Sequence, residues 1–468
     1  MLFSSSVFIV VFLPIVVIGY RLLAQNFRIY FLVIASFIFY AWGEPVYVLI
    51  MLASIIINYT CGIIIHISRR CNKPVRVTLL FLSLAGNLGI LFYFKYWNFV
   101  LSNANLLFHT NFALHDIVLP IGISFYTFQG MSYLIDLYYQ KVEVQKNPVL
   151  IAFLISFFPQ LTAGPIVRYA DIWQQFYSRS DSLEKFIEGV KRFIIGLGKK
   201  VIIANTVGYV ADQIFANNVT ENTAATAWLG IICYSFQIFF DFSGYSDMAI
   251  GLAKMFGFDF LENFNYPYIS KTITEFWRRW HISMSSWFRD YVYIPLGGNR
   301  TGNVYVNLLI VFVVTGFWHG ASFNFLIWGL WHGLFLIIER RFNAKEVRRK
   351  AFIPFRTFLT LLIVVIGWVF FRAKGLTEAV NFIGIMFGFV KPENVGFTAW
   401  YYLDTKVVII LIIATIASIP IVKMKWFKKL SISSIWKVVS VVLLLLLLSI
   451  SIVFVVSSSY NPFIYFRF

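Results

Sequence analysis

The chain of 468 residues is 59% hydrophobic and 13% charged, with a formal net charge of +18. Soluble globular domains carry about 25% charged residues, so this composition excludes an ordinary soluble protein. Long apolar runs alternate with short basic loops, which predicts an all-α polytopic membrane protein rather than a β-barrel. The positive-inside rule accounts for the excess of basic residues, so we expect no nucleic-acid partner.

The apolar runs follow one another along the whole chain. They lie at 7–24, 29–42, 46–67, 76–94, 117–139, 148–169, 187–216, 225–256, 303–318, 323–338, 353–371, 376–390, 406–422 and 438–456. Several are shorter than the roughly 20 residues needed to cross a bilayer, so we expect some to be re-entrant or paired with a neighbour. The pattern predicts about ten to thirteen transmembrane helices in one domain over 1–468. Basic clusters at Arg69–Arg76, Arg340–Arg356 and Lys423–Lys429 predict cytoplasmic loops, with the loop at 391–405 on the opposite side.

Polar residues interrupt three of these runs. Gln129 lies in LPIGISFYTFQ, Gln160 lies in FFPQLTAGPIVRY, and Asp241 and Asp247 lie in DFSGYSDMAIG. The prolines and glycines around Gln160 break a helix, and irregular backbone is tolerated at membrane depth only inside protein or beside a wet cavity. Each residue taken alone is explained by contacts between helices. Together they predict a polar cavity within a helical bundle.

The segment 257–302 is too polar to span the membrane, and we expect it to be interfacial or re-entrant. Thr272 and Glu275 have the spacing of a capping box, which predicts the start of a helix. The apolar residues after it recur every four positions or so, as on one face of an amphipathic helix: Phe276, Trp280, Met284, Trp287, Phe288 and Tyr291. One interpretation is an anchor lying in the membrane plane. The other is the wall of an active site, because His281 lies in the middle of the helix and Arg278 close to it.

Two further histidines occur in FWHGASFNFLIWGLWHG, as His319 and His332. On one straight helix they would be separated by about 19 Å and roughly 220° of rotation, so they cannot act on one atom. We predict a break over 320–324, since Gly, Ser and Asn favour turns. His319 beside this break is the chemical candidate, whereas His332 is expected to hydrogen-bond a neighbouring helix.

Known nucleotide-binding and hydrolase signatures are missing from the sequence. There is no Walker loop, dinucleotide fingerprint, HExxH or G-x-S-x-G pattern, and the three cysteines lack metal-ligand spacing. We therefore expect no bound metal or cofactor. A histidine that acts as general base on a hydroxyl needs neither a metal nor a cofactor, so it is compatible with this expectation.

The sequence resembles the membrane-bound O-acyltransferase superfamily, and within it the branch of the alginate O-acetyltransferase membrane subunit. The resemblance is carried by three motifs: WRRWHISMSSWFRDYVYIPLGGNR (277–300), TGFWHGASFNFLIWGLWHG (315–333) and the tail YNPFIYFRF (460–468). It implies that His319 is the catalytic histidine and that His281 is a second functional one. It also implies an acetyl-CoA donor at the cytoplasmic face, a separate extracytoplasmic acetyltransferase partner, a polysaccharide acceptor and the bacterial cytoplasmic membrane as location.

The aromatic tail over 457–468 has two interpretations. Aromatic side chains commonly lie at the headgroup level, so the tail can be a membrane anchor. However, F-I-Y-F-R-F resembles the end of a small partner in the teichoic-acid D-alanylation system, in which a tyrosine is proposed to carry the acyl group. By that resemblance Tyr465 is a candidate acyl carrier, since a covalent relay divides one transfer into two shorter steps.

Two other functions stay open from the sequence. A polytopic transporter would place carboxylates near the membrane midplane, where Asp241 and Asp247 qualify. An O-acyltransferase with another acyl donor and a lipid acceptor is the second. For the acetyltransferase, we expect substrate contacts from the following residues: Trp318, Asn324, Gln129, Gln160 and Arg278.

Overall fold

The computed structural model describes residues 1–162, 164–342, 353–458 and 460–463, and every regular element in that part is helical. Seven helical stretches there are long and apolar enough to cross a membrane: Val48–Arg70, Lys73–Phe108, Leu183–Ala216, Ala224–Met255, Ile353–Arg372, Thr405–Lys423 and Ser434–Ser457. Shorter apolar helices lie at Phe8–Leu22, Gln25–Ala41, Val304–His319 and Leu376–Met386. The prediction of an all-α polytopic membrane protein is confirmed. Fewer helices reach full length than the sequence pattern predicts, because several apolar runs form short or broken helices.

The chain divides into two compact units by its internal contacts. Unit 1 comprises 1–193 and 246–261, and unit 2 comprises 194–245 and 262–468. Unit 1 contains η1 (Phe8–Phe12), α1 (Leu13–Leu22), η2 (Gln25–Phe27), α2 (Arg28–Ala41), α3 (Val48–Ile67), η3 (Ser68–Arg70), α4 (Lys73–Phe108), α5 (Ile123–Tyr138), α6 (Pro148–Ser156), α7 (Phe158–Leu161), α8 (Tyr169–Ile172) and α9 (Gln175–Ser178). α10 (Leu183–Gly198) and α12 (Ala224–Met255) contribute residues to both units.

Buried amides join the helices of unit 1. Asn58 on α3 donates through Nδ2 to Asn87 Oδ1 on α4 at 2.9 Å. A Cβ on Gly130 of α5 would lie 2.4 Å from the Asn58 amide, so the missing side chain allows α5 to approach. The run 148–169 is divided into α6 and α7, as its prolines and glycines predict, and Phe158 N donates to Ser36 Oγ on α2 at 3.0 Å.

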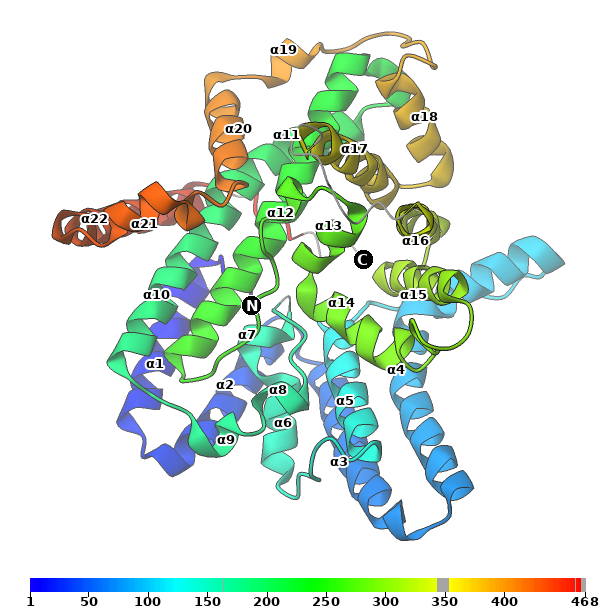
Figure 1. Ribbon diagram of the computed structural model, residues 1–468, viewed down its shortest axis with the longest axis vertical. Helices are drawn as coiled ribbons and strands as arrows, with labels where there is room; N and C mark the ends of the chain where they lie inside the picture. Colours follow the sequence, from blue (N-terminus) through cyan, green and yellow to red (C-terminus); the bar gives the residue numbers. More distant parts are fainter. Residues whose placement is uncertain (163, 343–352, 459, 464–468) are drawn as a thin grey trace. The chain divides into compact units, whose positions relative to one another are not determined.

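Unit 2 carries the segments of interest for function (Figure 1). Its remaining elements are η4 (Lys199–Ala204), α11 (Asn205–Ala216), η5 (Val219–Glu221), η6 (Pro267–Ile269), α13 (Ile273–Arg279), α14 (Ile282–Phe288), η7 (Arg289–Tyr293), α15 (Val304–His319), α16 (Phe323–Arg341), α17 (Ile353–Arg372), α18 (Leu376–Met386), α19 (Ala399–Tyr402), α20 (Thr405–Ala417), η9 (Ile421–Lys423), α21 (Lys425–Ser431) and α22 (Ser434–Ser457).

Glycines allow the helices of unit 2 to pack closely. α15 and α16 lie side by side in Figure 1, and Gly316 and Gly329 meet where they cross. A Cβ on Gly316 would lie 2.3 Å from the Phe325 carbonyl oxygen, and one on Gly329 would lie 2.2 Å from that of Phe312. Small residues let helix backbones approach in membranes, where lipid supplies no hydrophobic drive for association. This contact fixes the two helices that carry His319 and His332.

Candidate active site

The polar segment 257–302 folds as two short helices instead of the predicted continuous one. α13 begins as the capping-box spacing predicts, with Thr272 Oγ1 accepting from Glu275 N at 3.0 Å. The helix ends at Arg279, and α14 starts after His281, whose φ of 43° and ψ of 56° lie in the left-handed region. Backbone groups freed at the break pair with the preceding loop: Asn265 N donates to Arg279 O, and Ile282 N donates to Asn263 O, both at 2.9 Å. The prediction of one amphipathic helix was therefore wrong.

The break buries His281 completely and determines its tautomer. Its Nδ1 lies 3.1 Å from Asn263 Oδ1, which also accepts from Ser283 N at 3.2 Å and from Ser283 Oγ at 2.9 Å. Because a backbone N–H can only donate, this amide oxygen is an acceptor, and His281 must carry its proton on Nδ1. Nε2 is then the basic nitrogen. Burial lowers the pKa of His281 to about 3, so the ring is neutral at physiological pH.

His319 is the last residue of α15, directly before the second break in the chain. Gly320 ends the helix in an extended conformation, and Ser322 precedes the first residue of α16. The break predicted over 320–324 is confirmed and is shorter than expected, since Asn324 already belongs to α16. A Cβ on Gly320 would lie 2.2 Å from Phe325, so glycine is required at this turn.

Two tryptophans connect the three histidines of unit 2. The ring centroid of Trp318 lies 6.3 Å from that of His281 and 4.8 Å from that of His319. The Trp328 ring lies 5.0 Å from His319 and 5.2 Å from His332, meeting each almost edge to face. His281 and His319 therefore both lie next to the Trp318 indole, within a buried aromatic cluster. This arrangement brings together two histidines that 38 positions separate in the sequence.

His332 does not make the predicted hydrogen bond to a neighbouring helix. Among the described residues, neither ring nitrogen has a hydrogen-bond partner, and the side chain is fully buried. The rings of Trp277 and Trp328 lie 5.2 Å away, and Phe276 stacks nearly parallel at 6.3 Å. Gly367 of α17 allows close approach, since a Cβ there would lie 2.9 Å from His332 Nε2. Aromatic packing therefore replaces the predicted polar contact.

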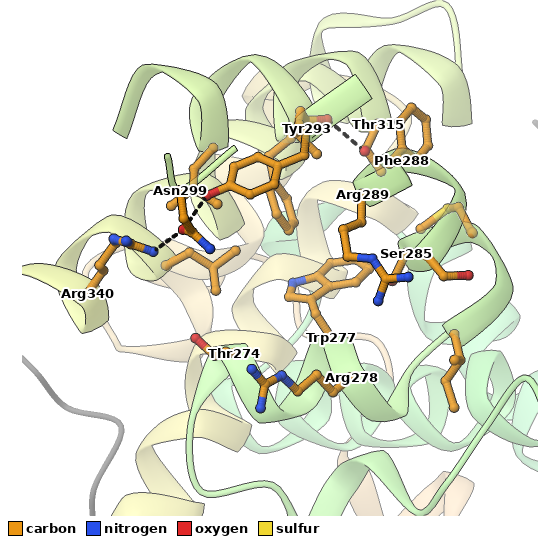
Figure 2. A pocket seen from close by; sticks show the side chains of 17 residues that line it. Thr274, Trp277, Arg278, Ser285, Phe288, Arg289, Tyr293, Asn299, Thr315 and Arg340 are labelled. Carbon is orange, nitrogen blue, oxygen red and sulfur yellow. Dashed lines mark hydrogen bonds between the residues drawn. The ribbon is translucent and has the colours of Figure 1, made fainter. Parts of the chain in front are cut away.

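A pocket of about 440 Å³ opens beside this cluster, and α13, α14, η7, α15 and α16 line it (Figure 2). Figure 2 shows Arg278, Arg289 and Arg340 arranged around Trp277. Arg340 donates to Asn299 Oδ1 at 2.9 Å, and that oxygen also accepts from the Tyr293 hydroxyl at 2.9 Å. No acidic side chain is present among the described residues of the lining, so the pocket is electrostatically positive.

The inner wall of the pocket is built from neighbours of the buried histidines. Thr315 lies one helical turn before His319 on α15 and lines the pocket. Phe288 also lines it and packs edge to face against Trp318, with 6.3 Å between the centroids. Trp277 faces the pocket and contacts the Trp328 ring at 5.7 Å. One layer of side chains thus separates the pocket from His319.

The other predicted site residues lie in different surroundings. Asn324 donates through Nδ2 to the Ala373 carbonyl at 2.8 Å, at the end of α17. Gln129 and Gln160 are fully buried in unit 1, where Gln160 Nε2 donates to Leu154 O at 2.5 Å. The Gln129 amide has no hydrogen-bond partner among the described residues. Substrate contact by these three residues stays a prediction, and Tyr465 lies outside the described residues.

Several residues of this site carry no signal in the sequence pattern. Asn263 lies 18 positions before His281 in an irregular stretch, where no periodicity or spacing singles it out. No pattern in the sequence singles out Trp277 or Trp328, which occur there only as members of the two longer motifs. Arg340 belongs to a basic cluster that the positive-inside rule already explains. Its contact with Asn299 is visible only in the folded protein.

Known proteins match most of the chain. The model of the membrane-bound O-acyltransferase family matches residues 77–373. The chain is 45% identical over 395 residues to the probable alginate O-acetylase AlgI of Pseudomonas putida, covering 83% of this chain and 81% of the relative. It is 38% identical over 426 residues to the peptidoglycan O-acetyltransferase of Helicobacter pylori, covering 83% and 80%. It is 30% identical over 271 residues to the teichoic acid D-alanyltransferase of Bacillus subtilis, covering 55% and 67%. The family match includes His281, His319 and the pocket.

Proposed function

The chain belongs to the membrane-bound O-acyltransferase family, and on that premise we propose that it moves an acetyl group from cytoplasmic acetyl-CoA across the bacterial cytoplasmic membrane to O-acetylate an extracytoplasmic polysaccharide. The chain is a multi-pass membrane O-acyltransferase. Its relatives in Pseudomonas putida and Helicobacter pylori are named for O-acetylation of alginate and of peptidoglycan, which supports acetyl as the acyl group and a polysaccharide as the acceptor.

The single observation that carries the proposal is the positive pocket that one layer of side chains separates from His319. Its volume of about 440 Å³ lies within the range of small-molecule sites, roughly 300–1,000 Å³. Arginine guanidinium groups bind phosphate oxygens well, because their N–H donors match the phosphate geometry. In this proposal Arg278 and Arg340, which line the pocket, bind the phosphates of the donor, whereas Arg289 is already paired with Asp290 at 2.6 Å. The acyl end of the donor would then point past Thr315 toward His319.

His319 acts as the general base in this proposal. It takes the proton of an acceptor hydroxyl, whose oxygen attacks the thioester carbonyl carbon. The new carbon–oxygen bond replaces the carbon–sulfur bond, and the thiolate leaves and takes up the proton from His319. The tetrahedral intermediate needs a hydrogen-bond donor. The donor in this proposal is the Trp318 indole N–H, because the Trp318 ring lies 4.8 Å from that of His319.

The first acceptor in our proposal is the hydroxyl of Tyr465. The acetyl-tyrosine would carry the group to a separate extracytoplasmic acetyltransferase, which passes it to the glycan. A covalent carrier replaces one difficult transfer by two easier ones.

The transporter alternative loses support from the ion pairs of the structure. Asp241 pairs with Lys200 at 2.6 Å within unit 2, and Asp247 pairs with Arg192 at 2.8 Å within unit 1. Each carboxylate already has a basic partner, so its charge is compensated without a coupled proton.

Inverted membrane vesicles given acetyl-CoA with a radiolabelled acetyl group test the proposal. We expect release of free CoA thiol and appearance of base-labile label on protein or glycan, both dependent on this chain. Movement of intact acetyl-CoA without release of the thiol would contradict the proposal and favour a transporter.

A further inference from the structure

After α22, the chain returns to the interior of unit 2 and binds there through residues 460–463. The Tyr460 hydroxyl donates to Asp212 Oδ2 on α11 at 2.7 Å, and its ring packs edge to face against Tyr209 at 5.4 Å. Asn205 Nδ2 donates to the Tyr460 carbonyl at 3.3 Å. Phe463 is only 3% exposed and lies 4.2 Å, between ring centroids, from Tyr245. The tail is therefore held by hydrogen bonds as well as by contacts between aromatic rings.

A buried ion pair lies at the centre of this tail-binding site. Lys200 Nζ contacts Asp241 Oδ1 at 2.6 Å, and the two side chains are 1% and 2% exposed. Removing two charges from water is costly, and the mutual attraction balances the cost only when the remaining donors and acceptors are also bonded. Lysine has three N–H donors, and Lys200 gives one of them to the Pro462 carbonyl. The tail therefore accepts from one of the donors that the ion pair leaves available on the lysine.

Asp212 supplies a second fixed point for the tail. Its Oδ1 accepts from Arg372 Nη2 at 2.7 Å, so α17 orients the carboxylate, and its Oδ2 accepts from Tyr460. An anchor at the membrane interface needs only exposed aromatic rings. A buried lysine and a partly buried carboxylate directed at one short peptide are expensive for that purpose alone.

We propose that Lys200, Asp241, Asn205 and Asp212 are positioning residues, which fix the C-terminal peptide so that the acyl-accepting tyrosine is presented for transfer. This inference rests on the proposed relay through Tyr465. Tyr465 follows Pro462 by three residues. Because an extended chain spans about 3.3–3.6 Å per residue, fixing the Pro462 carbonyl keeps the Cα atom of the tyrosine within about 10 Å of Pro462. The residues act through the tail and do not touch the donor.

Matched pairs of substitutions on the same two helical segments test the inference. The test variant is Lys200→Met with Asp241→Asn, which removes both buried charges together and leaves neither uncompensated. The control is Lys254→Met with Glu188→Gln, another ion pair between α10 and α12, which is joined at 2.7 Å and makes no contact with residues 460–463. Tyr460→Phe is a milder second variant, which removes only the bond to Asp212. Size-exclusion profiles and melting temperatures in detergent establish that each variant folds.

Two measurements are made on each variant. Carboxypeptidase Y digestion, followed by intact mass, reports how far the tail can be removed. We expect digestion of the parent and control proteins to stop before the tail-binding site, and digestion of the Lys200/Asp241 variant to continue through Tyr460. For the Lys200/Asp241 variant, kcat of acetyl transfer should fall by about 100-fold, a loss typical of a misplaced reacting group, while KM for acetyl-CoA stays unchanged. Tyr460→Phe should shift both measurements in the same direction.

An unchanged digestion pattern in both test variants would overturn the inference, and so would a released tail with normal transfer. Failure of the relay is separately visible, because Tyr465→Phe would then retain full transfer with the tail still protected. That result would remove the premise and the inference with it. Loss of transfer in the control pair equal to that in the test pair would likewise refute a specific positioning role.

Discussion

His281 and Asn263 share a hydrogen bond of 3.1 Å between Nδ1 and Oδ1, and this bond leaves Nε2 as the basic nitrogen of a buried neutral imidazole. The bond joins the left-handed residue between α13 and α14 to the loop before them. It therefore links the local backbone break to the protonation state of a side chain in the aromatic cluster around His319.

The depressed pKa of His281 makes stability depend on pH in a defined window. The unfolded side chain takes up a proton below its ordinary pKa of roughly 6.5, whereas the folded one does so only near 3, so stability falls as pH drops through this interval. Between pH 7 and pH 5 the contribution is about 2 kcal/mol. His281→Gln should reduce the loss of melting temperature between these pH values. An unchanged loss would show that the folded ring takes up its proton at the ordinary pKa, which would contradict a neutral buried ring.

Replacing His332 by phenylalanine should stabilise the protein. The ring lies among aromatic neighbours, and its two buried nitrogens have no hydrogen-bond partner among the described residues. A buried unsatisfied polar group costs about 1–3 kcal/mol, and phenylalanine keeps a flat aromatic ring, of somewhat larger volume, without that cost. We expect a higher melting temperature and polysaccharide acetylation close to that of the parent. Strong loss of acetylation with an intact fold would instead give His332 a chemical role.

Arg340→Gln should weaken binding of the donor. The arginine lines the positive pocket, and loss of a charge-assisted hydrogen bond corresponds to a rise of roughly tenfold or more in KM for acetyl-CoA, with little change in kcat. Arg279→Gln is the matched control, because Arg279 pairs with Glu275 at 2.9 Å and does not line the pocket. Equal effects of the two substitutions on KM would argue against the pocket as donor site.

Tyr465→Phe distinguishes the relay from the membrane anchor. The substitution keeps the aromatic ring and removes only the phenol oxygen that accepts the acetyl group in the relay. The relay predicts that acetylation of the polysaccharide falls nearly as far as in a variant without His319. Mass spectrometry of the parent, trapped with acetyl-CoA in the absence of the partner, should find the tail peptide heavier by one acetyl group. An active Tyr465→Phe variant would leave the anchor as the role of the tail.

The sequence predicts the architecture of this protein well where the signals are local. Apolar runs identify the long helices, Thr272 and Glu275 predict the start of α13, and glycine with serine predicts the break after His319. Each of these depends on residues that are close in the chain. Periodicity and turn propensity therefore contain the information.

The parts that the sequence did not predict depend on partners far along the chain. His281 takes a left-handed conformation that is uncommon for a residue other than glycine, and the loop at 263–265 stabilises it by taking up the freed backbone groups. The pattern of apolar residues continues smoothly through this break, so it predicts one helix. In the same way, the surroundings of His332 are set by α13 and α17, and no local pattern reports whether a neighbouring helix offers a ring or an acceptor.

Acetyl transfer by His319→Ala tests the central claim most directly, because the buried imidazole beside the donor pocket is the proposed base. The measurement is the O-acetyl content of the extracellular polysaccharide in a deletion strain that produces the parent, His319→Ala or His332→Phe at equal membrane levels. Loss of a general base typically costs about 10²–10⁴-fold, so we predict acetylation near background for His319→Ala and near the parent level for His332→Phe. Normal acetylation by His319→Ala would contradict the account.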